Sequence, residues 1–232
     1  MINVIFIGAS ALAETIHVIE ADSKIDEPHR VIGILDDDQG LIGQNICGIP
    51  VLGPIISASS FPSDTRFVFG IGSHRTCLER PEILGRTGVD VSRFPSFVHP
   101  SASILPGARV GYGCIVHPGV IVGQDAVLAG FNLVFPNSIV ASRNHLAAFS
   151  MVTALVSLTN GVRLGFCSFI GTGSIIGEQV NVDDGALVAL GSVVQRDIPA
   201  GVCVMGNPAR PYGKIELTSK FRDAALVCYP FP

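Results

Sequence analysis

An aliphatic residue recurs at every sixth position across residues 98–194. The series has seventeen members, all Val, Leu or Ile: Val98, Ile104, Val110, Val116, Val122, Leu128, Val134, Val140, Leu146, Val152, Leu158, Leu164, Ile170, Ile176, Val182, Val188 and Val194. Four residues after each of the first sixteen lies a second position, which is Ala, Ser, Val or Cys except at Asn132 and Asn144. A period of six matches neither a helix nor a free-standing alternating strand.

This period is typical of a triangular parallel β-helix, in which each hexad forms one face and three hexads complete a coil. The aliphatic residue then fills the narrow interior, and the small residue lies where the chain turns a corner. Sixteen hexads predict about five coils, a prism on the order of 25 Å long at the ~4.8 Å spacing of strands. A β-sandwich with a chance repeat is the alternative, which a register unbroken over 97 residues disfavours.

Before the hexads, the pattern changes to short apolar runs that end in small or acidic residues. Residues 2–7, 31–35 and 67–71 predict buried strands, which end at Gly8-Ala9-Ser10, Asp36-Asp37-Asp38 and Gly72-Ser73. Apolar residues at helical spacing predict a helix after the first strand, and a second helical stretch ends near residue 84. This alternation predicts a Rossmann-like α/β domain over residues 1–95, with residues 48–53 as a turn-rich connector.

The β-helix is predicted over residues 96–211, followed by a tail over residues 212–232 with a short helix at 216–226. Apolar residues make up 48% of the chain and charged residues 15%, typical of a solenoid whose flat faces pack against copies of itself. The net charge is −4 with no run of Lys or Arg, so nucleic acid is not expected as a partner.

Cysteine use and hydropathy bear on location. The six cysteines show no CxxC or metal-ligand spacing, so we expect no metal and a reducing compartment. No run approaches ~20 apolar residues, and the apolar start lacks the basic flank of a signal peptide. We therefore expect a cytoplasmic protein with no membrane insertion.

The turn after the first strand is a candidate ligand site. A helix N-terminus offers free N–H groups to a phosphate, Gly8 permits a tight turn, and Ser10 adds a hydroxyl. Because the G-x-G-x-x-G fingerprint is incomplete, we do not expect NAD. Gly8 either serves a ligand or only turns the chain. Asp36 and Asp37 lie where ligands of such folds bind, and they either hold a ribose or base or form a solvated loop.

Together these features resemble the bacterial sugar O- and N-acyltransferases of the sialic acid O-acetyltransferase type. This family includes N-acetyltransferases of a UDP-bacillosamine precursor and of GDP-perosamine. The resemblance rests on the Gly8-Ala9-Ser10 turn, the acidic strand end, His99-Pro100-Ser101-Ala102, the hexads and Asn207-Pro208-Ala209-Arg210. It implies a left-handed β-helix, a homotrimer, acetyl-CoA or another acyl-CoA between neighbouring prisms, and a nucleotide-linked amino sugar used for surface polysaccharide.

The resemblance also implies residue roles. The amino sugar would contact Gly8, Ala9, Ser10, Asp36, Asp37 and Gly72. The CoA groove would include Asn160, Gly161, Thr172, Leu190, Gly191, Asn207, Pro208 and Arg210. In the family an amine attacks the thioester, a backbone N–H stabilises the oxyanion, and a His removes the proton.

The catalytic positions depart from the family pattern. The third residue of the hexad at 140–145, where the family has its base, is Ser142. A second family His falls on Met151, and the Gly that faces the thioester falls on Asn160. The catalytic candidates are therefore His145, Ser142 and Asn144, with His145 either a shifted base or a face residue. His17, His74, His99 and His117 are expected at the surface.

Loss of the usual base favours an amine acceptor, since a neutral amine needs less help than a hydroxyl and positioning can supply the rate. The sequence thus predicts an acyl-CoA-dependent N-acyltransferase of a nucleotide-linked amino sugar. Two alternatives stay open. One is a sugar O-acetyltransferase in which His145 is the base, and the other is a non-catalytic trimeric binding protein.

Overall fold

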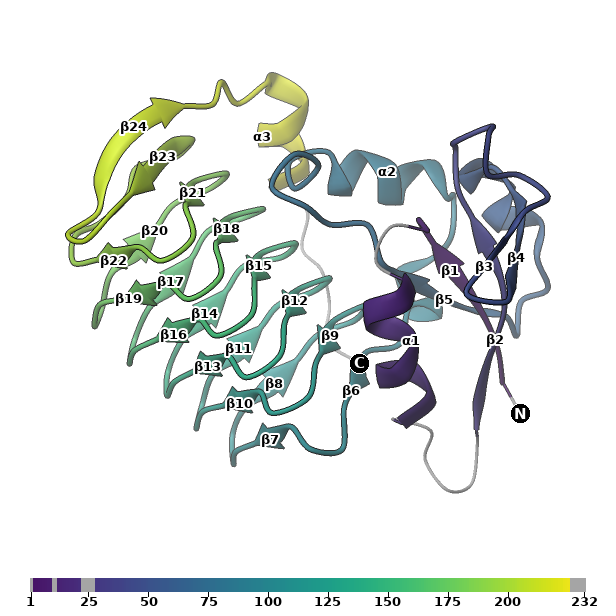
Figure 1. Cartoon of the computed structure of the whole chain (residues 1–232), viewed down its shortest axis with the longest axis horizontal. Coiled ribbons are helices and arrows are strands. Elements are labelled where there is room, and N and C mark those ends of the chain that lie inside the picture. The colour runs from purple at the N-terminus through teal and green to yellow at the C-terminus, as the bar shows by residue number, and fades with distance from the viewer. Residues whose placement is uncertain (1, 10–11, 22–27, 226–232) are drawn as a thin grey trace.

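The computed structural model describes residues 2–9, 12–21 and 28–225. Figure 1 shows a three-sided β-solenoid with a smaller α/β unit beside it, and a C-terminal helix that returns toward the α/β unit. Among the described residues, no helix is long and apolar enough to cross a membrane.

The α/β unit is built on one five-stranded sheet in the order β3-β4-β2-β1-β5. Its strands are β1 (Ile2–Ile7), β2 (His29–Leu35), β3 (Asn45–Ile46), β4 (Ile49–Gly53) and β5 (Arg66–Phe69), and all are parallel except β3. Helix α1 (Leu12–Ala21) connects β1 to β2, and η1 (Ile55–Ser60), α2 (Arg80–Arg86) and η2 (Val91–Arg93) follow. The three predicted strands are present in this parallel sheet.

Strand β4 corrects the prediction for residues 48–53. We expected a turn-rich connector, but Ile49, Val51 and Gly53 alternate as buried positions with exposed Pro50 and Leu52. Pro50 is tolerated because β4 pairs there only with the two-residue edge strand β3. The proline and glycines of this segment suggested turns, so the alternation of buried and exposed residues in β4 was not recognised from the sequence.

The repeat region folds into three parallel sheets, named here by their first strands. The β6 sheet contains β6 (Phe97–Val98), β9 (Ile115–Val116), β12 (Leu133–Val134), β15 (Met151–Val152), β18 (Phe169–Ile170), β21 (Leu187–Val188), β23 (Val202–Met205) and the antiparallel β24 (Arg210–Lys214). The β7 sheet contains β7 (Ser103–Ile104), β10 (Ile121–Val122), β13 (Ile139–Val140), β16 (Ser157–Leu158), β19 (Ile175–Ile176) and β22 (Val193–Val194). The β8 sheet contains β8 (Arg109–Val110), β11 (Val127–Leu128), β14 (His145–Leu146), β17 (Arg163–Leu164) and β20 (Asn181–Val182).

The hexad register is confirmed. Strands pair eighteen residues apart, as in Val122 with Val140, so each coil contains three hexads. The aliphatic series points inward, and its members from Val116 to Val194 are at most 2% exposed. Ile104 differs, at 38% exposed, because it lies in the first coil with nothing beneath it.

The corner positions from Cys114 onward are also buried, including the two asparagines. The Asn132 side chain donates to the Ala147 carbonyl at 2.7 Å, and the Asn144 side chain accepts from the Val162 N–H at 2.7 Å. Each amide thus satisfies backbone groups of the next coil that a small apolar residue would leave open.

The outer face of the β6 sheet is covered by the α/β unit. Phe97, Ile115, Leu133 and Met151 pack in one cluster with residues of β1 and α1. Gly72 approaches this face so closely that a Cβ atom there would lie 2.7 Å from Leu133 and 2.8 Å from Met151. The other two sheets have no such cover within the described chain.

Arg80 ties the two units together from a fully buried position. Its guanidinium donates to the carbonyls of Ile71 at 2.8 Å, Phe149 at 2.6 Å and Phe131 at 2.7 Å. The Phe69 and Phe149 rings lie 5.6 and 5.4 Å from its central carbon. Burial lowers the pKa of Arg80 to about 10, so the side chain stays charged at neutral pH.

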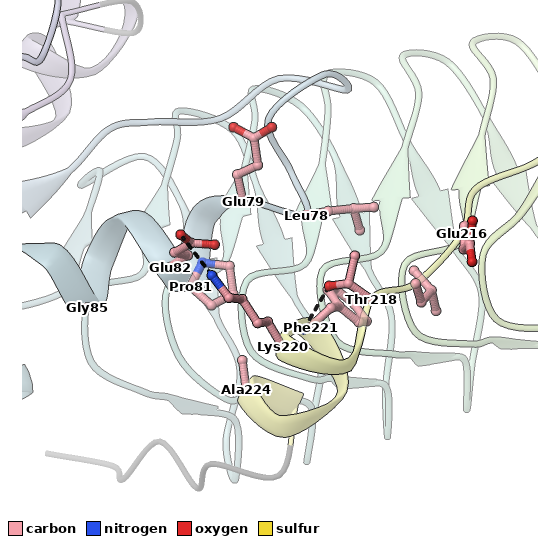
Figure 2. Close-up of a pocket in the computed structure, with 11 residues that line it drawn as sticks. Leu78, Glu79, Pro81, Glu82, Gly85, Glu216, Thr218, Lys220, Phe221 and Ala224 are labelled. Carbon is pink, nitrogen blue, oxygen red and sulfur yellow. Dashed lines mark hydrogen bonds and ion pairs between the residues drawn. The ribbon is translucent and has the colours of Figure 1, made fainter.

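The short C-terminal helix is confirmed as α3 (Ser219–Ala225). Its Phe221 ring lies 5.4 Å from Phe166 of the solenoid. Figure 2 shows α3 facing α2 across an open hollow, where Lys220 and Glu82 approach to 4.0 Å. Because both side chains are exposed, this pair contributes little to stability.

Neighbouring residues on β14 test the register. We expect Leu146→Asp to abolish folding, because the carboxylate would enter an interior with no room for water. His145→Asp, one residue away and exposed, should fold. Circular dichroism and size-exclusion chromatography provide the measurement, and a folded Leu146→Asp protein would refute the assigned register.

Replacement of Arg80 tests the junction. Arg80→Met should lower the free energy of unfolding by about 3 kcal/mol or more, because three buried carbonyls lose their donors. Arg75→Met, at an exposed position five residues earlier, is the control. Urea unfolding measures both variants, and equal stability would show that the three bonds contribute nothing net.

Candidate functional site

The C-terminal ends of β1 and β2 form a compact turn. The Ala9 N–H donates to the Asp36 carboxylate at 2.8 Å, and the Gly8 N–H donates to the Leu35 carbonyl at 2.8 Å. Gly8 has φ +86°, and a Cβ atom there would collide with Ile71. The structure therefore brings Gly8, Ala9 and Asp36 together beside the segment that holds Gly72. The predicted Ser10 lies outside the described residues.

The Asp37 side chain makes structural contacts away from this turn. One of its carboxylate oxygens accepts the Ile55 N–H at 2.9 Å, and the other lies 2.8 Å from the Arg86 guanidinium. These contacts hold η1 and α2 against the sheet. Of the two predicted acidic ligands, only Asp36 lies at the turn. Its two oxygens accept the N–H groups of Ala9 and Asp38, and each retains a lone pair.

The three catalytic candidates lie near the edge between the β7 and β8 sheets, but they face different ways. Ser142 is half-buried on the turn, whereas His145 is exposed on the outer face of the β8 sheet. Asn144 is directed into the corner, where it bonds to the Leu158 carbonyl and the Val162 N–H. Because its amide is occupied there, Asn144 has a structural place and is not available to a ligand.

His145 has the protonation state that a base requires. Partial burial, followed by the nearby Arg163 and Arg109 guanidinium groups, lowers the pKa of His145 below its usual value. The ring is therefore neutral at pH 7. Its position on the face, between Val127 and Arg163 of neighbouring strands, separates it from the turn at Ser142.

Asn160 and Gly161 lie one coil beyond Ser142 on the same edge. The Gly161 N–H donates to the Ser142 carbonyl at 3.1 Å, so it is used within the solenoid. The Asn160 N–H has no acceptor among the described residues. It is a backbone donor that could stabilise an oxyanion.

The other predicted CoA residues lie on the opposite edge of the β7 sheet. Thr172, Leu190 and Gly191 follow β18 and β21, and the Leu190 side chain is 78% exposed. A hollow of about 270 Å³ here is lined by His74, Phe169, Gly171, Thr172, Leu187, Ala189, Leu190 and Tyr212. Pro208 and Arg210 line a second hollow of about 310 Å³, whereas Asn207 is exposed beside it.

Sequence reasoning missed His74 and Tyr212 as members of the first hollow. His74 comes from the loop after β5 and contacts the Phe169 ring at 6.2 Å between centres. Its place after Gly72-Ser73, at a strand end, was the available signal. Tyr212 follows the Asn207-Pro208-Ala209-Arg210 segment on β24, and no motif pointed to it.

His117 corrects a prediction, since we expected it at the surface and it is 1% exposed. Its ring stacks on Phe135 with 4.8 Å between ring centres. The centre of the His17 ring lies 6.0 Å from that of His117 and 6.0 Å from that of His99. Neither ring nitrogen of His117 has a partner among the described residues. Burial, followed by the charges of His17 and His99, lowers the pKa of His117 to about 4.

The covering of His117 by α1 explains the error. Residue 117 follows two positions after Ile115, so both side chains lie on the outer face of the β6 sheet. Helix α1 packs against β6 and β9 there. A hexad pattern places residues on faces but does not show which face another element covers.

Within the described chain, no group of three His, Cys, Asp or Glu side chains has the geometry of a metal site.

Comparison with known proteins finds acetyltransferases, both by sequence and by structure. No protein-family model matches the chain. The chain is 30% identical over 129 residues to bifunctional protein GlmU of Rhizobium rhizogenes, a match that covers 56% of this chain and 28% of GlmU. It is 40% identical over 57 residues to a 2,3,4,5-tetrahydropyridine-2,6-dicarboxylate N-acetyltransferase of Clostridium perfringens, covering 25% of this chain and 24% of that enzyme. The chain therefore spans less than a third of these curated relatives.

Two solved structures match nearly the whole chain. The acetyltransferase domain of PglB from Neisseria gonorrhoeae has 27% identity and a TM-score of 0.77, with 91% of this chain and 100% of that chain covered. PerB from Caulobacter crescentus, solved with CoA and GDP-perosamine, has 26% identity and a TM-score of 0.76, with 91% and 97% covered. The PglB domain has also been solved with acetyl coenzyme A.

Fold and likeness together define a left-handed β-helix built from hexapeptide repeats. In sequence and fold the chain is similar to hexapeptide acyltransferases, among them the PglB acetyltransferase domain and GDP-perosamine N-acetyltransferase. The resemblance stated from the sequence is confirmed.

Acid should destabilise the protein through His117. Its folded-state pKa is lowered, so between pH 6.5 and about 4 the unfolded chain binds a proton that the folded chain excludes. The stability that His117 contributes is therefore fully present above pH 6.5. It is lost as the pH falls toward 4, which lowers the free energy of unfolding by about 3 kcal/mol. Urea unfolding should show a flatter pH dependence in His117→Phe, whereas His74→Gln should follow the wild type. An unchanged slope in His117→Phe would contradict this assignment.

Proposed function

We propose that the chain is an acyl-CoA-dependent N-acyltransferase that transfers an acetyl group to the amine of a nucleotide-linked sugar. The observation that carries the proposal is the likeness to the PglB acetyltransferase domain and PerB over 91% of the chain, which includes the α/β unit. Those proteins were solved with acetyl coenzyme A, or with CoA and GDP-perosamine. A cytoplasmic role in surface polysaccharide synthesis is part of the proposal.

The chain divides into three functional parts in this proposal. Residues 1–95 hold the nucleotide sugar at the turn formed by Gly8, Ala9 and Asp36. Residues 96–211 form the acyltransferase domain. Residues 212–232 form a tail that contributes Tyr212 to the hollow beside Thr172 and returns α3 to α2.

A homotrimer would complete the site. Within one chain, the β7 sheet separates the edge with Ser142 and Asn160 from the edge with Thr172 and Leu190. The outer face of that sheet is mostly apolar, and Ile121, Ile139 and Ile175 are 40–45% exposed there. If three copies turn this face toward a common axis, each Ser142 edge meets the Thr172 edge of its neighbour, and acyl-CoA fits between them.

The acyl-transfer chemistry follows from this arrangement. The amine attacks the thioester carbonyl, and the Asn160 N–H donates to the developing oxyanion. Ser142 cannot replace an imidazole as a base, since a hydroxyl is far too weakly basic at neutral pH. An amine acceptor tolerates this change better than a hydroxyl does, because its nitrogen attacks while neutral.

Assembly and cofactor binding can be tested together. Light scattering should give three times 24.3 kDa, and acetyl-CoA at 100 times its Kd should stabilise the protein by about 2.7 kcal/mol. Ile139→Asp should dissociate the trimer and remove this stabilisation, whereas Val127→Asp on the β8 sheet should retain both. A stable wild-type mass near 24 kDa would contradict the assembly, and no response to acetyl-CoA would favour a non-catalytic binding protein.

His145 should matter little to the reaction. We expect His145→Ala to lower kcat/KM by less than tenfold, because its ring lies on the β8 face and away from the Ser142 turn. Removal of a general base normally costs ~10²–10⁴-fold. Ser142→His should add a limb near pH 6.5 to the pH–rate profile. A hundredfold loss in His145→Ala, with the trimer intact, would instead support the O-acetyltransferase with a shifted base.

A further inference from the structure

Three histidines from separate segments converge beside α1. His17 lies on α1, His99 follows β6, and His117 follows β9. The His17 ring centre lies 6.0 Å from each of the other two. We refer to these residues as the imidazole cluster. His17 is exposed, His99 is half-buried, and His117 is fully covered.

The cluster lies on the edge of the prism that carries the proposed CoA groove. His99, His117, Phe135 and Thr153 succeed one another at eighteen-residue intervals, and the Thr172 hydroxyl bonds to Thr153 at 3.2 Å. At ~4.8 Å per coil, His117 lies three coils, or about 15 Å, from Thr172 along this edge. The pantetheine arm of CoA is long enough to cover such a span.

His99 is fixed as a donor. The Ser101 N–H donates to its Nδ1 at 3.1 Å, and the Ser101 hydroxyl lies 2.8 Å from the same nitrogen. Since Nδ1 accepts, the proton of the neutral ring is on Nε2. The Ser101 hydroxyl also accepts the Gly119 N–H at 3.2 Å, which fixes the turn. The Ser101 contacts thus fix the His99 ring, and its Nδ1 lone pair is already used.

His117 has the opposite character. One of its ring nitrogens must carry a lone pair, and no described group donates to it. A buried polar atom without a partner is rare, and it calls for a reason. Phe135 covers one side of the ring, while His17 and His99 are the titratable groups that act on it. Burial keeps this ring neutral, so its lone pair remains available to a neighbouring imidazolium.

We propose that His17 is the proton acceptor for acyl transfer in this chain, with His99 and His117 as its positioning residues. This inference rests on the proposed function. His17 is the exposed member, and its helix begins three residues after Ala9 of the turn that is proposed to hold the nucleotide sugar. It supplies an imidazole in place of the one expected at position 142, where this chain has Ser142. The lone pair of His117 stabilises the charge on His17 without taking the proton itself.

The amine nitrogen forms a bond to the thioester carbonyl carbon, and the tetrahedral intermediate then expels CoA thiolate as the C–S bond breaks. The proton lost from the nitrogen passes to the His17 imidazole. His17 then returns it to the thiolate, so the products are the amide and CoA thiol, and the cluster is again neutral.

Kinetics with acetyl-CoA and GDP-perosamine test the assignment. His17→Gln should lower kcat by a hundredfold or more, with the KM for acetyl-CoA within twofold of wild type. Glu20→Gln, an exposed change further along α1, is the matched control and should leave both unchanged. A His17→Gln enzyme within threefold of wild-type kcat would overturn the proposal.

The pH–rate profile for acetyl transfer provides a second test. His117→Phe keeps an aromatic ring against Phe135 but removes the lone pair, so the acid limb of the profile should move to lower pH, which a purely structural role would not cause. An acid limb that His117→Phe leaves unmoved would overturn the proposal. Wild-type protein that neither binds acetyl-CoA nor transfers acetyl would overturn the proposed function itself.

Discussion

The buried guanidinium of Arg80 joins the two halves of this molecule. It forms no ion pair with a carboxylate among the described residues; instead, its N–H groups donate to the carbonyls of Ile71, Phe131 and Phe149. Two of these carbonyls belong to successive coils of the solenoid, and the third follows β5. Because a buried charge is stable only when its donors are satisfied, small displacements of the α/β unit are opposed by three directional bonds at once. The turn at Gly8, Ala9 and Asp36 is thereby held in a fixed position relative to the coil faces.

The solenoid in turn fixes the chemistry of each edge. Every coil repeats the same three corners, so residues eighteen apart in sequence lie side by side. The edge with Ser142 and Asn160 provides an open backbone donor, and the edge with Thr172 and Leu190 provides hollows. One apolar sheet lies between them. A groove with both walls therefore requires association of copies, and it links cofactor binding to assembly in this proposal.

Much of the fold could be predicted from the sequence, because hexads act through an interior that admits only aliphatic residues at one position in six. Strands β1, β2 and β5 of the α/β unit were also visible as apolar runs, whereas β4 was not. Tertiary covering was not visible, since the pattern around His117 resembles that of exposed corners. Asn144 and Asp37 show the same limit at the candidate site: both are polar residues at suggestive positions, and backbone groups of distant segments occupy them.

The coil-building positions and the expected catalytic positions of this chain differ in how well they match the family pattern. The positions that build the coils have aliphatic or small side chains, whereas the register that the resemblance implies would place the family base at Ser142 and the second family histidine at Met151. Met151 packs against Gly72 in an apolar contact where an imidazole would need a hydrogen-bond partner. With Ser142 at that position, this wall of the proposed groove offers no imidazole to accept a proton, whereas the imidazole cluster lies on the other wall. In the proposed trimer the two walls face each other, so the proposed base would act from the opposite wall while the thioester stays in place.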